Sequence, residues 1–218
     1  MKKDNLPVLA IETTGELCSA AVLLDENRYV ESSFNLKHVH SEKLAKCINS
    51  ILEDLKLNAD EIGSVAISAG PGSFTGLRIG FAVGKGIAFG ASLPVVAVPT
   101  FEALALQISS IMPEGTKFSI ANKANLDEVY FGKFEAVEKG FKKVSEIKII
   151  KESAIEEQID GNEVLFGNNK NGRTKSLSSP SALFVAKWSY FFGNDLLSFD
   201  YDFLEPNYIK NFVMREKK

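Results

Sequence analysis

Apolar and polar residues follow two different periods in the first half of the chain. Two short apolar runs and a third segment that alternates weakly and is rich in aromatic and β-branched residues, separated by polar turn residues, predict an antiparallel meander of three strands. These three segments cover residues 6–12, 17–24 and 29–36. From Ser41 the period lengthens, and apolar residues recur as on one face of a helix that ends near Leu57. The apolar residues of this face are Leu44, Ile48, Ile51 and Leu55.

Helices and strands alternate after the meander. The pattern predicts a strand at residues 65–68, a helix at 75–89, a strand at 95–98 and a helix at 100–111. A meander alone is typical of a β-sandwich, and pure alternation is typical of a doubly wound sheet. The combination predicts an α/β fold in which three antiparallel strands are followed by two strands joined through helices, as in ribonuclease-H-like domains.

The second half of the chain gives a weaker signal of the same kind. Strands are predicted at residues 117–122, 128–135, 144–151 and 164–166, with a short helix from Ser153 and an amphipathic helix at 181–192. This order predicts a smaller, degenerate copy of the first domain, with Trp188 in its core. Because Pro113 and Gly115 break the preceding helix, the boundary is placed there, which gives domains of residues 1–112 and 113–218.

Composition limits the class of protein. The 218 residues are 45% hydrophobic and 24% charged, which excludes a disordered or collagen-like chain. A net charge of −3 excludes binding of nucleic acid by bulk electrostatic attraction. Cys18 and Cys47 lack the spacing of metal ligands, and two cysteines are too few for a disulfide scaffold. No signal peptide or uninterrupted membrane-spanning run is found, so we expect a cytoplasmic protein that is not bound to a membrane.

The strongest local signal is a glycine-rich segment that starts at Gly70. It reads GPGSFTGLRIGFAVGKGIAFG. Lys85 is followed by glycine rather than serine or threonine, so the segment is not a Walker phosphate loop. Gly76 comes one position too late for a dinucleotide fingerprint, and Thr75 stands where a nucleophile elbow around Ser73 needs glycine. The segment therefore predicts no cofactor site and no catalytic residue.

The same segment places three glycines on one ridge of a helix that is apolar nearly all round. Gly76, Gly80 and Gly84 are four positions apart. Each costs about 0.5–1 kcal/mol relative to alanine in a helix, so a close approach of another backbone is expected as compensation. The chain's own sheet can cover one side, and the other side needs a neighbouring helix or another chain. We favour a subunit interface, and expect Gly80→Leu or Gly84→Leu to abolish pairing without unfolding the monomer.

Five pieces of the sequence resemble the bacterial TsaB (YeaZ) family. They are LAIETTGELCSAAVLL from Leu9, His40-Ser41-Glu42, GPGSFTGLRIGFAVGKGIA from Gly70, DEVYF from Asp127 and PNYIK from Pro206. The resemblance implies an actin-like ATPase fold made of two tandem ribonuclease-H-like domains. It also implies a noncatalytic subunit, without metal or cofactor, of the complex that forms threonylcarbamoyladenosine beside the anticodon of tRNA. That subunit pairs with the catalytic TsaD paralogue, is joined by the TsaE ATPase, and meets tRNA through the complex.

The resemblance also assigns roles to residues. The two N-terminal helices are expected to form the partner interface, and without the partner the same surface is expected to form a homodimer. The expected interface residues are Ser41, Leu44, Ile48, Ile51, Gly76, Leu77, Gly80, Phe81, Gly84 and Ile87. Glu12, Thr13 and Thr14 are expected to be a vestigial nucleotide hairpin. Relatives typically have Asp in place of Glu12 and Asp-Ala-Arg in place of Lys123-Ala124-Asn125, and both differences weaken a catalytic reading.

Three alternatives remain open from the residues alone. A small active ATPase or sugar kinase of the same superfamily would need a phosphate-binding hairpin, a second phosphate loop and an adenosine loop, for which residues 167–169 are a weak candidate. A metal site would use His38 and His40, but a spacing of two does not place both on one helix face. This spacing also counts against a metallopeptidase. Arg78 is expected either to pair with an acid of a partner or to lie at a solvated edge.

Overall fold

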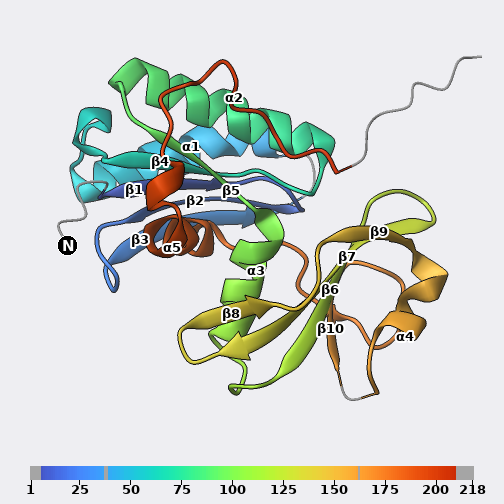
Figure 1. Ribbon diagram of the computed structural model, residues 1–218. Coiled ribbons are helices and arrows are strands. Elements are labelled where there is room, and N and C mark those ends of the chain that lie inside the picture. The colour runs from blue at the N-terminus through green and yellow to red at the C-terminus, as the bar shows by residue number, and fades with distance from the viewer. Residues whose placement is uncertain (1–5, 37–38, 162, 210–218) are drawn as a thin grey trace, which may run out of the picture.

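The computed structural model describes residues 6–36, 39–161 and 163–209 and contains two β-sheets with helices packed against them (Figure 1). The first sheet has five strands in the order β3-β2-β1-β4-β5. They are β1 (Val8–Glu12), β2 (Leu17–Leu23), β3 (Tyr29–Asn35), β4 (Ser64–Ser68) and β5 (Val95–Val98). Strands β1 to β3 pair antiparallel, and β4 and β5 join them in parallel. The sequence prediction of three meander strands followed by two crossover strands is confirmed.

Helices cover both faces of this sheet (Figure 1). On one face, α1 (His40–Leu55) packs on β2 and β3, and α2 (Phe74–Ala91) packs on β4 and β1. On the other face, α5 (Ala182–Phe192) packs on β1 and β2 and contacts α3 (Thr100–Ser109). Because side chains alternate along a strand, Leu9 and Ile11 belong to the core under α1 and α2, whereas Val8 and Ala10 belong to the core under α5.

The second sheet contains six strands in the order β11-β10-β6-β7-β8, and β9 pairs with β7 beside that path. They are β6 (Lys117–Lys123), β7 (Glu128–Val137), β8 (Gly140–Lys143), β9 (Lys148–Lys151), β10 (Val164–Gly167) and β11 (Lys175–Ser176). Short helices complete the fold: α4 (Ile155–Gln158), η1 (Ala59–Glu61), η2 (Glu152–Ala154) and η3 (Asn194–Leu196). The single strand expected at residues 144–151 was wrong at its start, because Gly140, at φ +141°, opens the separate strand β8.

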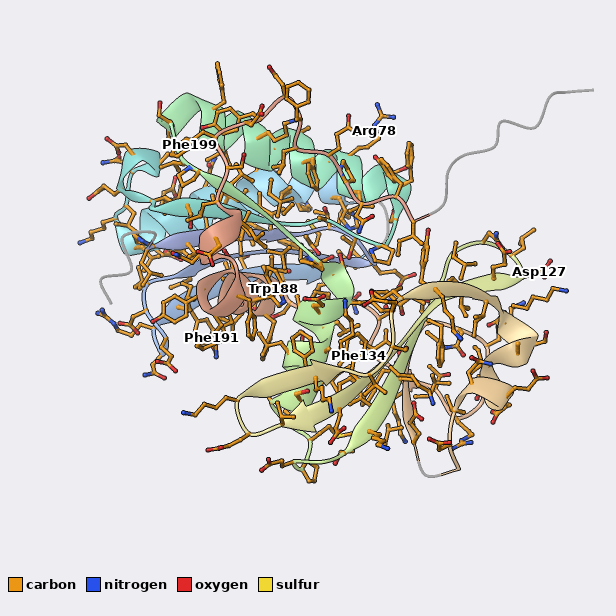
Figure 2. The ribbon with its side chains drawn as sticks, viewed as in Figure 1. Arg78, Asp127, Phe134, Trp188, Phe191 and Phe199 are labelled. Carbon is orange, nitrogen blue, oxygen red and sulfur yellow. The ribbon has the colours of Figure 1, made fainter. Side chains whose placement is uncertain are left out.

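The second half of the chain returns to the first sheet. Trp188, expected in the core of the second domain, lies instead in the core between α5 and the first sheet (Figure 2). The N-terminus of α5 is bound there too: the amide of Ala182 donates to Ser19 Oγ at 3.0 Å, and that of Leu183 donates to Glu31 Oε1 at 3.1 Å. The expected grouping of residues 113–218 into one domain therefore needs correction, since α5 completes the core of the first sheet.

A further segment, residues 197–209, runs along α2 and is called the C-terminal strap (Figure 1). Ser198 pairs with Val95 through two backbone hydrogen bonds. The hydroxyl of Tyr201 donates to the carbonyl of Leu93 at 2.8 Å. Near the other end, the amide of Asn207 donates to the carbonyl oxygen of Ala69 at 2.7 Å. The strap thus follows α2 from its C-terminal end to its N-terminal end. None of the helices in the described residues is long and apolar enough to span a bilayer.

Candidate functional site

The glycine ridge of α2 faces the chain's own sheet. Gly76, Gly80 and Gly84 are all buried. A methyl group at Gly76 would lie 1.9 Å from the carbonyl oxygen of Thr13, and one at Gly84 would lie 2.5 Å from Cδ1 of Ile67. The glycines therefore let the helix backbone approach β1, its following turn and β4. The expectation that this ridge meets another subunit was wrong, because the sequence could not tell which side of an all-apolar helix the sheet covers.

Most other expected interface residues are also buried within the chain. They are Leu44, Ile48 and Ile51 of α1 and Leu77 and Phe81 of α2, each at most 4% exposed. Their burial in the monomer leaves them no surface to offer a partner, which corrects that assignment. Ile87 is partly buried and Ser41 is exposed, so these two remain accessible.

The two helices present different outer faces. The outer face of α2 is apolar and small: Ala82, Gly86 and Phe89 are exposed, while Ile79 and Val83 are partly buried. Phe89 is 73% exposed. The outer face of α1 is polar, with exposed residues Glu42, Ala45, Lys46, Asn49 and Glu53. We call the first set, Ile79, Ala82, Val83, Gly86 and Phe89, the outer α2 stripe.

Arg78 lies on an exposed turn of α2, beside this stripe (Figure 2). Its guanidinium carbon is 5.4 Å from the centroid of the Phe74 ring. The ring of Phe74 in turn contacts Tyr208 of the C-terminal strap at 5.3 Å between centroids. The side chain is thus held over an aromatic ring at the surface, and it is accessible to an acid of a partner.

The β1–β2 hairpin uses its hydrogen-bond donors within the chain. The amide and the hydroxyl of Thr14 both donate to Glu12 Oε1 at 2.5 Å. The hydroxyl of Thr13 donates to the carbonyl oxygen of Gly76 at 2.8 Å, and the amide of Ser73 donates to the carbonyl oxygen of Thr14 at 2.7 Å. A phosphate-binding hairpin needs such donors free to face an anion. Here the Thr14 donors bind Glu12 within the hairpin, while the Thr13 hydroxyl and the Ser73 amide hold the hairpin to the N-terminus of α2.

The carboxyl group of Glu12 is completely buried. The residue has no exposed surface, and Oε2 has no hydrogen-bond partner in the described residues. Burial raises the pKa of Glu12 from 4.5 to about 7, against the side chain of Ser68 and the bonds from Thr14, which favour the ionised form. A carboxyl group of this kind is a poor ligand for a hydrated cation, because the cation cannot reach it without a movement of the hairpin.

The space next to the hairpin is filled by the chain itself. The segment before α5 passes between the two sheets, where Ser179 lies against Gly15 and is 7% exposed. The carbonyl oxygen of Ser178 accepts a hydrogen bond from Asn122 Nδ2, at the end of β6. Residues 178 and 179 thus occupy the junction between the β1–β2 hairpin and the second sheet.

The weak candidate for an adenosine loop, residues 167–169, is bound to β6. A methyl group at Gly167 would lie 2.0 Å from the carbonyl oxygen of Ala121, and the side chain of Asn169 donates to that same oxygen at 2.9 Å. Asn168 Oδ1 accepts the amide of Lys123 at 2.8 Å. These contacts use the polar groups of the loop to join it to the sheet.

A cleft of about 490 Å³ opens beside the hairpin, where α1 and α2 both begin. His40 and Ser41 of α1 line it together with Ser73, Thr75 and Gly76 of α2. His38 lies outside the described residues. No group of three or more His, Cys, Asp or Glu side chains in the described part of the chain could hold a metal ion.

Sequence reasoning missed two features of the surface. It did not separate the outer α2 stripe from the buried glycine ridge, because a helix that is apolar on most sides gives no direction. It also missed the exposed aromatic residues Phe191 and Phe192 at the end of α5, each 46% exposed. The sequence did contain a sign of this exposure: Phe191 and Phe192 are adjacent, and two consecutive residues of a helix cannot both face one sheet.

Comparisons with known proteins agree on one family. A family model described as "TsaD: tRNA N6-adenosine threonylcarbamoyltransferase" matches residues 35–193. A Haemophilus influenzae protein named tRNA threonylcarbamoyladenosine biosynthesis protein TsaB is 28% identical over 98% of this chain and 98% of its own length. The Escherichia coli protein of the same name is 34% identical over 61% of this chain and 57% of its own length.

Two solved structures share the fold. One is described as an uncharacterized protein with similarity to peptidase YEAZ from Pseudomonas aeruginosa, with a TM-score of 0.77, and the other as YeaZ from Pseudomonas aeruginosa, with a TM-score of 0.75. Each is 22% identical in sequence and covers 93% of this chain, while the match covers 99% of the solved chain. The two sheets and their helices therefore have the architecture of these proteins, which fits the actin-like, ribonuclease-H-like fold expected from the sequence. Because the family model matches most of the chain and the full-length relative is a TsaB protein, the chain belongs to the TsaD family of that model and, within it, to the TsaB (YeaZ) proteins.

Proposed function

We propose that this chain is a noncatalytic subunit in the formation of threonylcarbamoyladenosine in tRNA. The names of its relatives support the pathway. The noncatalytic role is supported above all by the β1–β2 hairpin, whose Thr13 and Thr14 donors are bound within the chain and whose Glu12 is buried. The metal ion and the transfer reaction then belong to a TsaD-like paralogue, and tRNA is met through the assembled complex.

The pairing surface in this proposal is the outer α2 stripe together with the outer face of α1. An apolar stripe on a helix that is otherwise packed in a core is an interaction site when its large side chains remain exposed, as Phe89 does. Small side chains at Ala82 and Gly86 let a partner helix approach closely. Without the paralogue, the same surface pairs with a second copy of this chain, and a TsaE-like ATPase joins the complex with the paralogue.

Gly86→Arg tests this surface without disturbing the fold, because no described atom outside the backbone of α2 lies within 4 Å of a Cβ built at Gly86. Gly172→Arg is a matched control, since Gly172 is equally open and lies in the second half of the chain. We expect light scattering to give a dimer for the wild type and Gly172→Arg and a monomer for Gly86→Arg. A dimer that persists in Gly86→Arg would contradict the assignment of the stripe.

The catalytic assignment is tested by purifying the chain with a TsaD-like paralogue. Threonylcarbamoyl transfer to tRNA is measured for each protein alone and for both together with a TsaE-like ATPase. We expect no transfer by this chain alone and transfer only in the complete mixture. Transfer by the isolated chain would contradict the noncatalytic role.

The second candidate is a small active ATPase or sugar kinase of the same superfamily. The cleft of about 490 Å³ at the start of α1 and α2, lined by three hydroxyl side chains, is the observation that favours it. Calorimetric titration with magnesium-ATP separates the two proposals. Micromolar affinity with turnover by the isolated chain supports the ATPase, and the absence of turnover supports the noncatalytic subunit.

A further inference from the structure

An aromatic groove lies on the face of the first sheet opposite to α1 and α2. It has a volume of about 650 Å³ and is formed by α3, α5 and the β7–β8 turn. Phe184, Phe191 and Phe192 line it from α5. The ring of Phe192 contacts those of Phe141 and Trp188, at centroid distances of 6.0 and 5.8 Å, which fixes this wall of the groove. A rigid, half-exposed aromatic wall is typical of the anchor region of a protein interface.

The groove contains polar groups that the chain does not satisfy. Lys187 is partly buried, and its Nζ lies 5.6 Å from the centroid of the Phe184 ring. No carboxylate of the described residues forms an ion pair with Lys187. Ser109 is 8% exposed, lines the groove, and its Oγ has no hydrogen-bond partner in the part of the chain that the structure describes. An ammonium held against an aromatic wall is complementary to one negative charge.

The remaining charges of the groove lie at its rim. Lys139, Glu26, Glu114 and Glu138 line it from turns and loops and are exposed. Exposed rim charges contribute little to affinity because water and salt screen them, whereas Lys187 is partly buried and its ammonium is held against the Phe184 ring. The charge that selects a ligand is therefore that of Lys187.

We propose that the aromatic groove binds a short segment of another protein in which an acidic residue stands beside apolar residues. The carboxylate meets the ammonium of Lys187, and the apolar side chains pack on Phe191 and Phe192. Both phenylalanines are 46% exposed, so the groove is open along one side, as suits a peptide; a small-molecule pocket would enclose most of its ligand. This site goes beyond the proposed pairing through α1 and α2, lies on the other face of the sheet, and is independent of it.

The test uses the full chain and a phage-displayed library of short random peptides as the probe. Trp188, the single tryptophan of the chain, reports binding through its fluorescence because its ring contacts Phe192. We expect the selected peptides to combine Asp or Glu with apolar residues. Lys187→Glu should weaken them by about tenfold or more, and replacing their acid by lysine should restore binding to Lys187→Glu.

Two further variants complete the test. Phe192→Ala should weaken the peptides by a similar factor, and Phe203→Ala should not change binding, because Phe203 is 84% exposed on the strap and does not line the groove. Lys187 belongs to none of the hydrophobic core clusters, so Lys187→Glu keeps the core intact and tests the proposal even if Phe192→Ala fails to fold. Peptides that bind Lys187→Glu as tightly as the wild type, or a selection that enriches no acidic peptide, would overturn the proposal. Neither result bears on pairing through the outer α2 stripe, which Gly86→Arg tests separately.

Discussion

The carboxyl group of Glu12 is buried at the end of β1, and one of its oxygens has no hydrogen-bond partner among the described residues. In an unfolded chain the same group would be hydrated and would ionise near its ordinary pKa of 4.5, whereas in the folded chain that pKa is about 7. The folded state therefore holds this proton more tightly than the unfolded state. As a consequence, the contribution of Glu12 to stability decreases as the pH rises above 4.5 and levels off above about 7.

Glu12→Gln removes this titration while keeping an oxygen that accepts from Thr14. We expect the variant to match the wild type most closely at about pH 4, where the carboxyl is protonated in both states, and to become the more stable of the two by up to about 3 kcal/mol at about pH 8. Urea unfolding of both proteins at the two pH values measures the difference. If the difference in unfolding free energy between the two proteins were the same at both pH values, the burial of an ionisable group at this position would be contradicted.

The residues of the hairpin show which part of the site the sequence could predict and which part it could not. The positions of Glu12 at the end of the first strand and of Thr13 and Thr14 in the turn after it followed from the apolar pattern. The partners of their side chains did not, because Gly76 lies 63 positions further along the chain than Thr13. Contacts at such separation depend on the packing of α2 on the sheet, which a local pattern does not contain.

At the scale of the element, α2 was correctly predicted as a buried, glycine-ridged helix, but its orientation was not. The helix is apolar on most sides, so periodicity gave no direction. The close contact at Gly76 supplies that direction, since there is no room for a side chain between the helix and the turn after β1. By contrast α1 has one apolar and one polar face, and its buried residues Leu44, Ile48 and Ile51 were predicted with the right period.

Two glycines of α2 give opposite predictions for the same substitution. Gly76→Ala places a methyl group on the carbonyl oxygen of Thr13, and we expect it to destabilise the fold by about 2 kcal/mol or more. Gly86→Ala meets no atom within 4 Å, and we expect it to stabilise the helix by about 0.5–1 kcal/mol. Thermal or urea unfolding of the two variants checks both signs. Equal effects would show that the helix is turned differently on its sheet.

The substitutions Gly80→Leu and Gly84→Leu, expected from the sequence to separate subunits and leave a folded monomer, now have a different expected outcome. A Cβ at either position would lie 2.5 Å from a side-chain atom of the sheet or its following turn. We expect both variants to lose stability in the monomer, as judged by a lower unfolding temperature at high dilution. A change in mass alone, with the unfolding temperature unchanged, would contradict this.

At the scale of the whole molecule, the order of elements was predicted well in the first half and less well in the second. In the first half, β1, β2, β4 and β5 are almost wholly buried and mostly apolar, and the helices have clear ends. In the second half, the β7–β8 hairpin and the return of α5 to the first sheet were missed. The apolar residues of α5 could pack on either sheet, and the sequence pattern does not show which sheet they fit.

The return of α5 predicts that the first half does not fold by itself. A fragment of residues 1–112 would lack the side chains of Leu183, Val185 and Trp188, which pack on that face of the sheet. Burial of a large apolar side chain contributes about 1.5–3 kcal/mol, so losing several removes an amount comparable to a total stability of about 5–15 kcal/mol. We expect the fragment to show no cooperative urea transition and to bind a hydrophobic dye, and a separately produced fragment of residues 113–218 to restore cooperative unfolding when added. Cooperative unfolding of the fragment alone would mean that α5 is dispensable and that the two halves are independent domains after all.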